Sequence, residues 1–199
     1  TMRDPIAIQS TGRYTVLSPS SKILVSILAC SLLAACATSP TGRRQLMLIS
    51  PDAAIVQSKQ AYLSTVSDLS KEDKLLADPK LAQRVATITG RLVTVAIEKY
   101  PQTAKWEWSV ALIDDPETVN AWCMAGGRMA VYSGLFEKLK LTDSEFAQIM
   151  GHEISHALAN HTAERMSRAM ATSIGVLAIG VASDRPAATM AGGAVAAKL

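Results

Sequence analysis

The sequence has no strong excess of charge, few aromatic residues and no basic run. Its 199 residues carry a formal net charge of +3, and 5% of them are aromatic. Because this small charge comes with no RNA-binding motif, we do not expect nucleic acid to be a partner. The hydrophobic content of 49% is ample for a core, and the length predicts one domain with additional segments.

The chain also lacks an apolar run that is long enough to span a membrane. The stretches at residues 23–35 and 173–181 are both shorter than the roughly 20 residues that a spanning helix needs. The first follows Lys22 and is compatible with the apolar region of a signal peptide. It ends in Leu33-Ala34-Ala35-Cys36, which looks like a bacterial lipobox, where small residues precede a cysteine that is lipidated before cleavage.

We therefore predict that residues 1–35 are a signal peptide with an extended n-region and that Cys36 is the lipid anchor to the membrane. The rival Cys30 follows only seven residues of the apolar stretch, which is too few for a signal core with its flanks. By resemblance to lipoproteins of Gram-negative bacteria, Ala37 in place of Asp favours the outer membrane, at its periplasmic face. Residues 36–50 are polar and rich in turn formers, so we expect a solvated linker there.

Cysteine is scarce beyond this region. Cys123 is the one cysteine left after the predicted signal peptide and anchor. No disulfide can form within a mature chain whose Cys36 is lipidated. A lone cysteine between apolar residues is typical of a small buried side chain, so we expect Cys123 to belong to the core.

All three histidines of the chain fall within ten residues, and two of them belong to the stretch His152-Glu153-Ile154-Ser155-His156. This H-E-x-x-H pattern is the signature of a zinc peptidase. Residues four apart on a helix lie about 40° apart around its axis, so both imidazoles can bind one ion.

Zinc in catalytic sites keeps one position open for water, which becomes a nucleophile near neutral pH. We predict one Zn²⁺ per chain, with His152 and His156 as ligands and Glu153 as the catalytic base that passes a proton to the leaving amine. The alternative is that both are ordinary histidines on a polar helix face.

The context of the motif predicts a helix from about residue 143 to about residue 172. Thr142 and Glu145 form the pattern of a capping box, and apolar residues then recur at helical spacing. On a continuous helix His161 would lie about 140° around the axis from His156 and about 7.5 Å along it, and Glu164 would lie about 12 Å along it. We therefore expect neither to bind the metal, and we expect His161 to support the site, to pack or to lie at the surface.

Further helices are predicted at about 51–67, with Ser50 as N-cap, at about 79–99, and over a short stretch that ends near residue 139. Alternating apolar residues predict strands at 106–113, 119–124 and 128–132, with turns at 114–116 and 126–127.

Three segments resemble the gluzincin family of zinc metallopeptidases that includes HtpX, the CAAX prenyl endopeptidases and lipidated periplasmic proteases. Residues 120–135 resemble its N-A-x-x-x-P-G-G segment with the strand and G-L turn that follow, although Ala125 stands where the family has proline. Residues 151–156 with Asn160 and His161 match its metal helix. The lipoprotein start with residues 39–46 resembles its lipidated members.

The resemblance implies an α+β, mainly helical zincin-type metallopeptidase domain with a small β-sheet or hairpin before the H-E-x-x-H helix. It also implies that the strand before this helix is an edge that binds extended substrate by strand addition. The implied substrate-binding residues are Asn120, Gly127, Arg128, Met129, Ala130 and Val131. The alternative is that this hairpin only packs the core.

The family's third zinc ligand is a glutamate in an E-x-x-x-D pattern on a later helix. Downstream of Arg168 the one acidic residue is Asp184, which lies in a predicted turn and matches nothing. We therefore expect residues 51–199 to be a partial metallopeptidase domain of a truncated or fragmentary sequence.

The resulting hypothesis is a zinc endopeptidase of the bacterial envelope that hydrolyses misfolded or unassembled proteins. The alternatives are a chaperone or assembly lipoprotein of the same fold with an incomplete site, and a structural lipoprotein with a chance motif.

Overall fold

The structure is a computed structural model of the 199-residue chain, and it describes residues 36–40 and 42–182. The predicted signal peptide at residues 1–35 and Asp184 lie outside the described residues. The chain divides into two units after Cys36, and the residues from Ala37 onward form the second. No helix in the described ranges is both long and apolar enough to cross a membrane.

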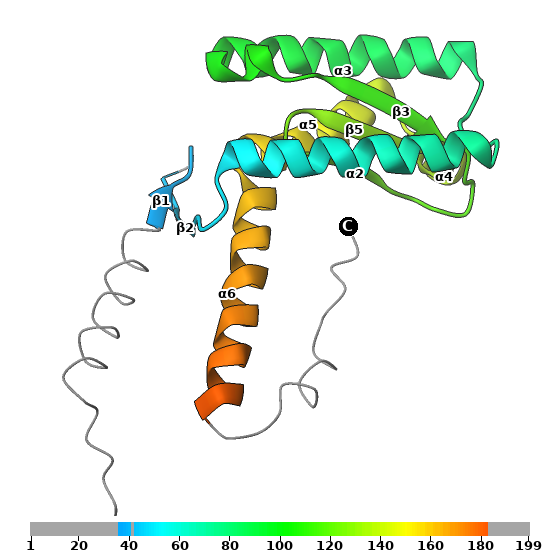
Figure 1. Ribbon diagram of the computed structural model, residues 1–199. Coiled ribbons are helices and arrows are strands. Elements are labelled where there is room, and N and C mark those ends of the chain that lie inside the picture. The colour runs from blue at the N-terminus through cyan, green and yellow to red at the C-terminus, as the bar shows by residue number, and fades with distance from the viewer. Residues whose placement is uncertain (1–35, 41, 183–199) are drawn as a thin grey trace, which may run out of the picture. The chain divides into compact units, whose positions relative to one another are not determined.

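Helices make up most of the described chain, and the strands form two small sheets (Figure 1). The predicted α+β, mainly helical class is therefore confirmed. The elements are β1 (Cys36–Thr38), β2 (Arg44–Leu46), α2 (Pro51–Lys71), α3 (Pro79–Lys99), the 3₁₀ helix η1 (Pro101–Lys105), β3 (Ser109–Ile113), β4 (Ala121–Met124), β5 (Arg128–Tyr132), α4 (Ser133–Leu139), α5 (Asp143–Leu158) and α6 (His161–Ala182).

Side-chain caps start three of the helices where the sequence predicts them. The side chain of Ser50 accepts a hydrogen bond from the backbone N–H of Ala53 at the start of α2, and Asp78 caps α3 in the same way. At the start of α5, Thr142 and Glu145 form the predicted capping box. Each such cap is worth about 1 kcal/mol, because it satisfies backbone donors that the helix itself leaves free.

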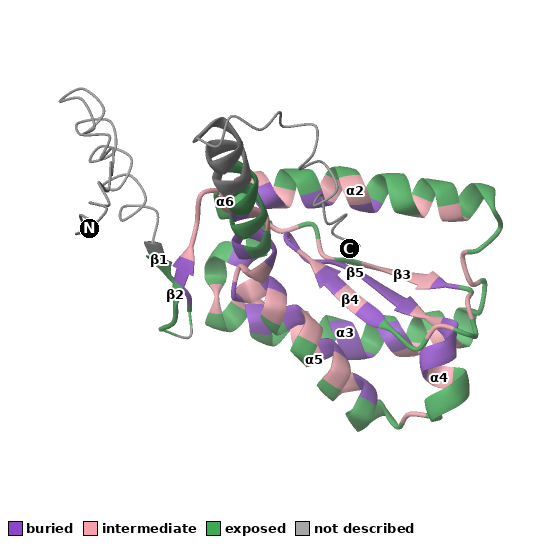
Figure 2. Ribbon diagram, turned by 90° about the horizontal axis from the view of Figure 1, so that it is seen from below, coloured by how far each residue is buried: buried purple, intermediate pink, exposed green. Residues whose placement is uncertain are grey.

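The larger sheet has the strand order β3-β5-β4, which places β5 at its centre. Strand β3 pairs with β5 in parallel and β4 pairs with it antiparallel. Figure 2 shows β5 buried along most of its length. The predicted edge at residues 127–132 is therefore wrong, because both sides of β5 are occupied by other strands and leave no backbone groups for an incoming peptide.

Helices pack against both faces of this sheet. On one face a core cluster joins α3 and α5 to β4 and β5, with Phe146 and Met150 fully buried at its centre. On the other face α2 lies along β4 and β5, where the rings of Tyr62 and Trp122 meet edge to face at 6.0 Å. The sheet thus holds α5 in place from one side and is shielded by α2 on the other.

The strand predicted to begin at Trp106 begins instead at Ser109, because residues 101–105 form η1 and Trp106 ends it. Trp106 and Trp108 still pack against the core cluster, as their alternation with Val110 and Leu112 predicts. The next strand likewise begins at Ala121 rather than at residue 119.

The turn between β4 and β5 requires glycine. Gly126 and Gly127 have φ values of +87° and +83°, a backbone region that other residues rarely adopt. A methyl group added to Gly127 would lie 2.5 Å from the ring of Trp108.

We expect Gly127→Ala to lower the free energy of unfolding by about 1–3 kcal/mol, because the indole has to move and the backbone is strained. Urea unfolding of the full chain measures this. Gly90→Ala is the matched control, since nothing lies within 4 Å of the added methyl group in α3. It should leave stability unchanged or raise it by up to about 1 kcal/mol. Equal effects of the two changes would contradict the role of the turn.

The segment at residues 36–50, expected to be a solvated linker, is folded onto the rest of the second unit from Ala37 onward. Strands β1 and β2 pair with each other, and Gln45 of β2 is 2% exposed. Arg43 and Gln45 bind the beginning of α6, which Figure 1 shows beside β2. The expectation failed because these polar side chains have buried partners far along the chain.

Candidate active site

The H-E-x-x-H stretch lies on α5, and this helix is shorter than predicted. It ends at Leu158, Asn160 follows with φ +57°, and α6 begins at His161. The prediction of one helix to residue 172 is therefore wrong. The break is stabilised by hydrogen bonds: the N–H of Asn160 donates to the carbonyl of Ala157, and the N–H of Glu164 donates to the carbonyl of Asn160. Asparagine tolerates the left-handed region better than most residues, which suits it to this position.

The imidazoles of His152 and His156 meet one turn apart on α5. Their Nε2 atoms are 3.0 Å apart, and the ring planes are nearly perpendicular. Two nitrogen ligands bound to one tetrahedral zinc at 2.0–2.1 Å lie about 3.3 Å from each other. The spacing of the two imidazoles is therefore compatible with a shared ion, and Glu153 follows His152 on the same helix.

His161 stands against the other side of the His156 ring. Its Nδ1 lies 2.6 Å from Nδ1 of His156, whereas His152 faces Nε2 of that ring. The three histidines therefore form a row, and no group of three or more His, Cys, Asp or Glu side chains suited to one metal ion occurs among residues 36–40 and 42–182. The helix break brings His161 to this position, so the offset expected for a continuous helix is wrong. A supporting position of His161 is compatible with the structure.

The environment of His161 favours its neutral form. Burial, followed by the positive charges of His156 and Arg43, holds the pKa of His161 below its ordinary value. A neutral imidazole has one ring nitrogen that accepts a hydrogen bond. If His156 presents its Nε2 lone pair to a metal, its Nδ1 carries the proton and can donate it to Nδ1 of His161.

Three side chains donate hydrogen bonds to the carboxylate of Glu164 in the first turn of α6. We call Glu164 together with Arg43, Gln45 and Arg168 the Glu164 network. Arg43 donates from both terminal nitrogens to the two oxygens of Glu164, one of these bonds being 2.9 Å long. Nε2 of Gln45 donates to Glu164 at 3.0 Å and to the carbonyl of Ala159 at 2.8 Å. Arg168 donates to Glu164 at 2.7 Å.

These donors hold the pKa of Glu164 at about 2, with the hydrogen bond from Arg43 as the largest cause. The carboxylate is therefore ionised throughout the physiological range. No pattern in the sequence indicated this network. Arg43 and Gln45 stood in a segment of the family resemblance, but nothing in their spacing pointed to Glu164, 121 residues away from Arg43.

Strand β4 packs against α5 and brings Cys123 close to Glu153. The thiol is buried, as predicted, and burial together with the negative charge of Glu153 raises the pKa of Cys123 to about 12. The thiol therefore stays protonated at neutral pH, and Cys123 has the character of a core residue rather than a nucleophile. The influence of the Glu153 carboxylate on Cys123 also places β4 next to the predicted catalytic base.

The residues predicted to bind substrate divide into two groups. Met129, Ala130 and Val131 are at most 2% exposed in the central strand. Arg128 is also buried, where it pairs with Glu107. Gly127 lies against Trp108, so none of these five residues belongs to a free edge. Asn120 is exposed, and it directly precedes β4, which is an edge strand of this sheet in the described part of the chain.

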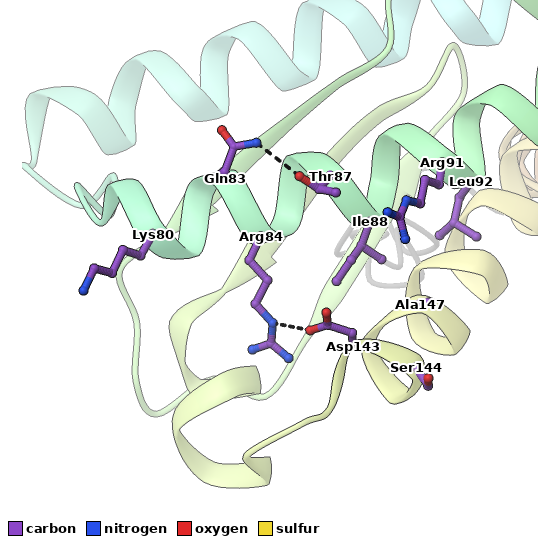
Figure 3. Close-up of a pocket in the computed structure, with 10 residues that line it drawn as sticks. All are labelled: Lys80, Gln83, Arg84, Thr87, Ile88, Arg91, Leu92, Asp143, Ser144 and Ala147. Carbon is purple, nitrogen blue, oxygen red and sulfur yellow. Dashed lines mark hydrogen bonds and ion pairs between the residues drawn. The ribbon is translucent and has the colours of Figure 1, made fainter.

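A groove of about 530 Å³ lies between α3 and the first turns of α5 (Figure 3). Arg84 reaches across it and donates to Asp143 at 2.7 Å and to the carbonyl of Leu141 at 2.6 Å. Figure 3 also shows Gln83 bonded to Thr87 on α3. Arg84 thus fixes the start of α5 to α3, and the groove shares no residue with the H-E-x-x-H stretch.

Comparison with known proteins finds matches to metallopeptidases. Residues 79–197 match the model of peptidase family M48. The chain is 33% identical to mitochondrial metalloendopeptidase OMA1 of Arabidopsis thaliana over 107 residues, 52% of this chain and 20% of that protein. It is 32% identical to the beta-barrel assembly-enhancing protease of Yersinia pestis over 123 residues, 59% of this chain and 24% of that protein. The corresponding Escherichia coli K12 protease is 33% identical over 101 residues, 51% of this chain and 19% of that protein. The chain thus spans about a fifth to a quarter of the length of these relatives.

Proposed function

Because the chain belongs to peptidase family M48, we propose that it is a zinc-dependent endopeptidase of the bacterial envelope. The observation that supports this best is the 3.0 Å separation of the Nε2 atoms of His152 and His156, with Glu153 between them on the helix. Two imidazole nitrogens at this separation can share one metal ion, and Glu153 is their neighbour in the sequence of α5.

In this proposal His152 and His156 hold the zinc through their Nε2 atoms. A catalytic zinc site has three protein ligands, and the family resemblance implies that the third is a glutamate on a later helix. Zinc, when bound, supplies a Lewis acid that lowers the pKa of a water molecule toward about 7. Glu153 accepts the proton from the attacking water and delivers it to the leaving amine.

Strand β4 is the element best placed to hold the substrate. It is an edge strand among the described residues, packs on α5 and carries Cys123 next to Glu153. An extended peptide that pairs with this edge would be held by its backbone, which tolerates many side chains. The strand-addition role that we assigned to Gly127 and residues 128–131 therefore passes to Ala121–Met124, together with the neighbouring Asn120.

Such sequence-tolerant binding suits misfolded or unassembled periplasmic and outer-membrane proteins as substrates. The relatives named beta-barrel assembly-enhancing protease support an envelope role. The lipobox pattern supports anchoring through Cys36 at the periplasmic face of the outer membrane. A chaperone or assembly lipoprotein of the same fold remains the alternative function.

Metal content and cleavage of an unfolded protein test the proposal. The test uses the complete protein as the cell makes it, because a catalytic site needs a third ligand besides His152 and His156. We expect this protein to bind one zinc ion per molecule and to cleave casein, and we expect a chelator to abolish cleavage and added zinc to restore it. The measurements are elemental analysis and gel electrophoresis of casein digests. A chain that holds no stoichiometric zinc and cleaves nothing, yet suppresses aggregation of an unfolded protein, would overturn the protease proposal in favour of the chaperone.

A further inference from the structure

His156 has a hydrogen-bonding partner on the side that does not face His152. Histidines that bind a metal usually donate their second ring N–H to an acceptor, which fixes the tautomer and the ring orientation. In the described part of the chain the partner at Nδ1 of His156 is Nδ1 of His161, at 2.6 Å. The position of His161 therefore bears directly on the orientation of His156.

The backbone does not fix this position by itself. His161 is the first residue of α6, and the break at Asn160 separates it from α5. A helix that begins just after a break can tilt about that break unless other contacts hold it. The distance between the two imidazoles then depends on what holds α6 in place.

Residues in and beside strand β2 form hydrogen bonds on both sides of the helix break at Asn160. Gln45 donates to the carbonyl of Ala159 at the end of α5 and to Glu164 in the first turn of α6. Arg43 binds the same carboxylate with both of its terminal nitrogens. One further turn along α6, the hydroxyl of Ser167 accepts a hydrogen bond from the backbone N–H of Ile49 at 2.9 Å. Bidentate arginine–carboxylate pairs fix direction as well as distance, so α6 cannot rotate freely about its axis.

We propose that the Glu164 network positions His161 as the acceptor for Nδ1–H of His156, so that residues Arg43 and Gln45 set the orientation of a metal ligand. This inference rests on the proposed function, because it needs His156 to bind a metal. Arg43, Gln45 and Glu164 are positioning residues that act through His161. They touch neither the metal nor the substrate.

The test measures the affinity of the complete protein for zinc, by competition for the metal with a chromophoric chelator. His161→Ala removes the acceptor and should weaken zinc binding by about 10–100-fold, the range typical for loss of such a partner. His161→Asn should restore most of the affinity, because its amide oxygen can occupy roughly the place of Nδ1. If His161 only packed against its neighbours, the zinc affinities of His161→Ala and His161→Asn would not differ in this way.

The contribution of Arg43, which lies far from His161 in the sequence, is tested by comparing its substitution with that of the adjacent Arg44. Arg43→Ala should weaken zinc binding in the same direction as His161→Ala, and it should cause no further loss when His161 is already alanine. Arg44→Ala is the matched control, since it removes the same charge at the adjacent, exposed position and should bind zinc as the unchanged chain does. Circular dichroism of the metal-free variants at the assay temperature verifies that each is folded.

The outcomes separate this inference from the proposed function. If the unchanged chain binds no zinc, the proposed function fails and this inference fails with it. If the unchanged chain binds zinc, but His161→Ala or Arg43→Ala binds it equally well, only the positioning role is overturned. Additive losses of affinity from the two substitutions would also overturn it, because they would show that Arg43 does not act through His161.

Discussion

Replacing Glu153 with glutamine is expected to slow peptide hydrolysis by about 10²–10⁴-fold while zinc binding is retained. Glutamine keeps the shape of the side chain but cannot accept a proton from the attacking water. Because His152 and His156 are unchanged, the metal should still bind. Rates of casein cleavage and zinc content, measured on the same preparation, check both parts of this expectation.

Glu137→Gln is the matched control for this experiment, because it makes the same chemical change at an exposed position on α4. It should leave the rate of cleavage unchanged. A Glu153→Gln variant that cleaves casein at the rate of the unchanged chain would remove Glu153 from the mechanism, and with it the main chemical argument for a protease.

Acid should remove a large part of the stability that Glu164 provides. Its pKa is about 2 in the folded chain against an ordinary value of 4.5. Because the folded value is the lower one, the contribution is fully present above about pH 4.5 and is lost as the pH falls toward 2. It amounts to at most about 3 kcal/mol, since Arg43 and Arg168 are partly exposed and solvent screens their charges.

Urea unfolding at a series of pH values tests this contribution by comparing the unchanged chain with Glu164→Gln. At pH 7 the variant should be less stable by up to about 3 kcal/mol. The difference should shrink as the pH falls from 4.5 toward 2, because glutamine resembles the protonated acid. Glu98→Gln, at an exposed position of α3, should follow the unchanged chain throughout. A difference that stays constant between pH 7 and pH 2.5 would show that charge at Glu164 is not the cause.

Local features of the fold could be predicted because they depend on residues close together in the sequence. The predicted caps at Ser50 and Thr142 each need one side chain and a backbone N–H three residues later. The hairpin of β4 and β5 needs only the two glycines between them. The pairing of His152 and His156 needs one turn of helix.

Features that depend on distant residues could not be predicted in this way. The sequence shows β4 and β5 as neighbours, but it does not show that β3 pairs in parallel with the other side of β5. This is why the predicted substrate edge was placed on the wrong strand. The bond between Arg43 and Glu164 is equally remote. The break at Asn160 is different, since asparagine after a helix end is a known local signal that our sequence interpretation did not use.

The attachment of Arg43 to α6 also limits how far α5 could lie from a bilayer if Cys36 is lipidated. Only six residues lie between Arg43 and Cys36, the predicted site of lipidation. A fully extended chain of that length reaches at most about 25 Å. A lipidated form would therefore hold the end of α5 close to the headgroup layer of the membrane that carries the lipid.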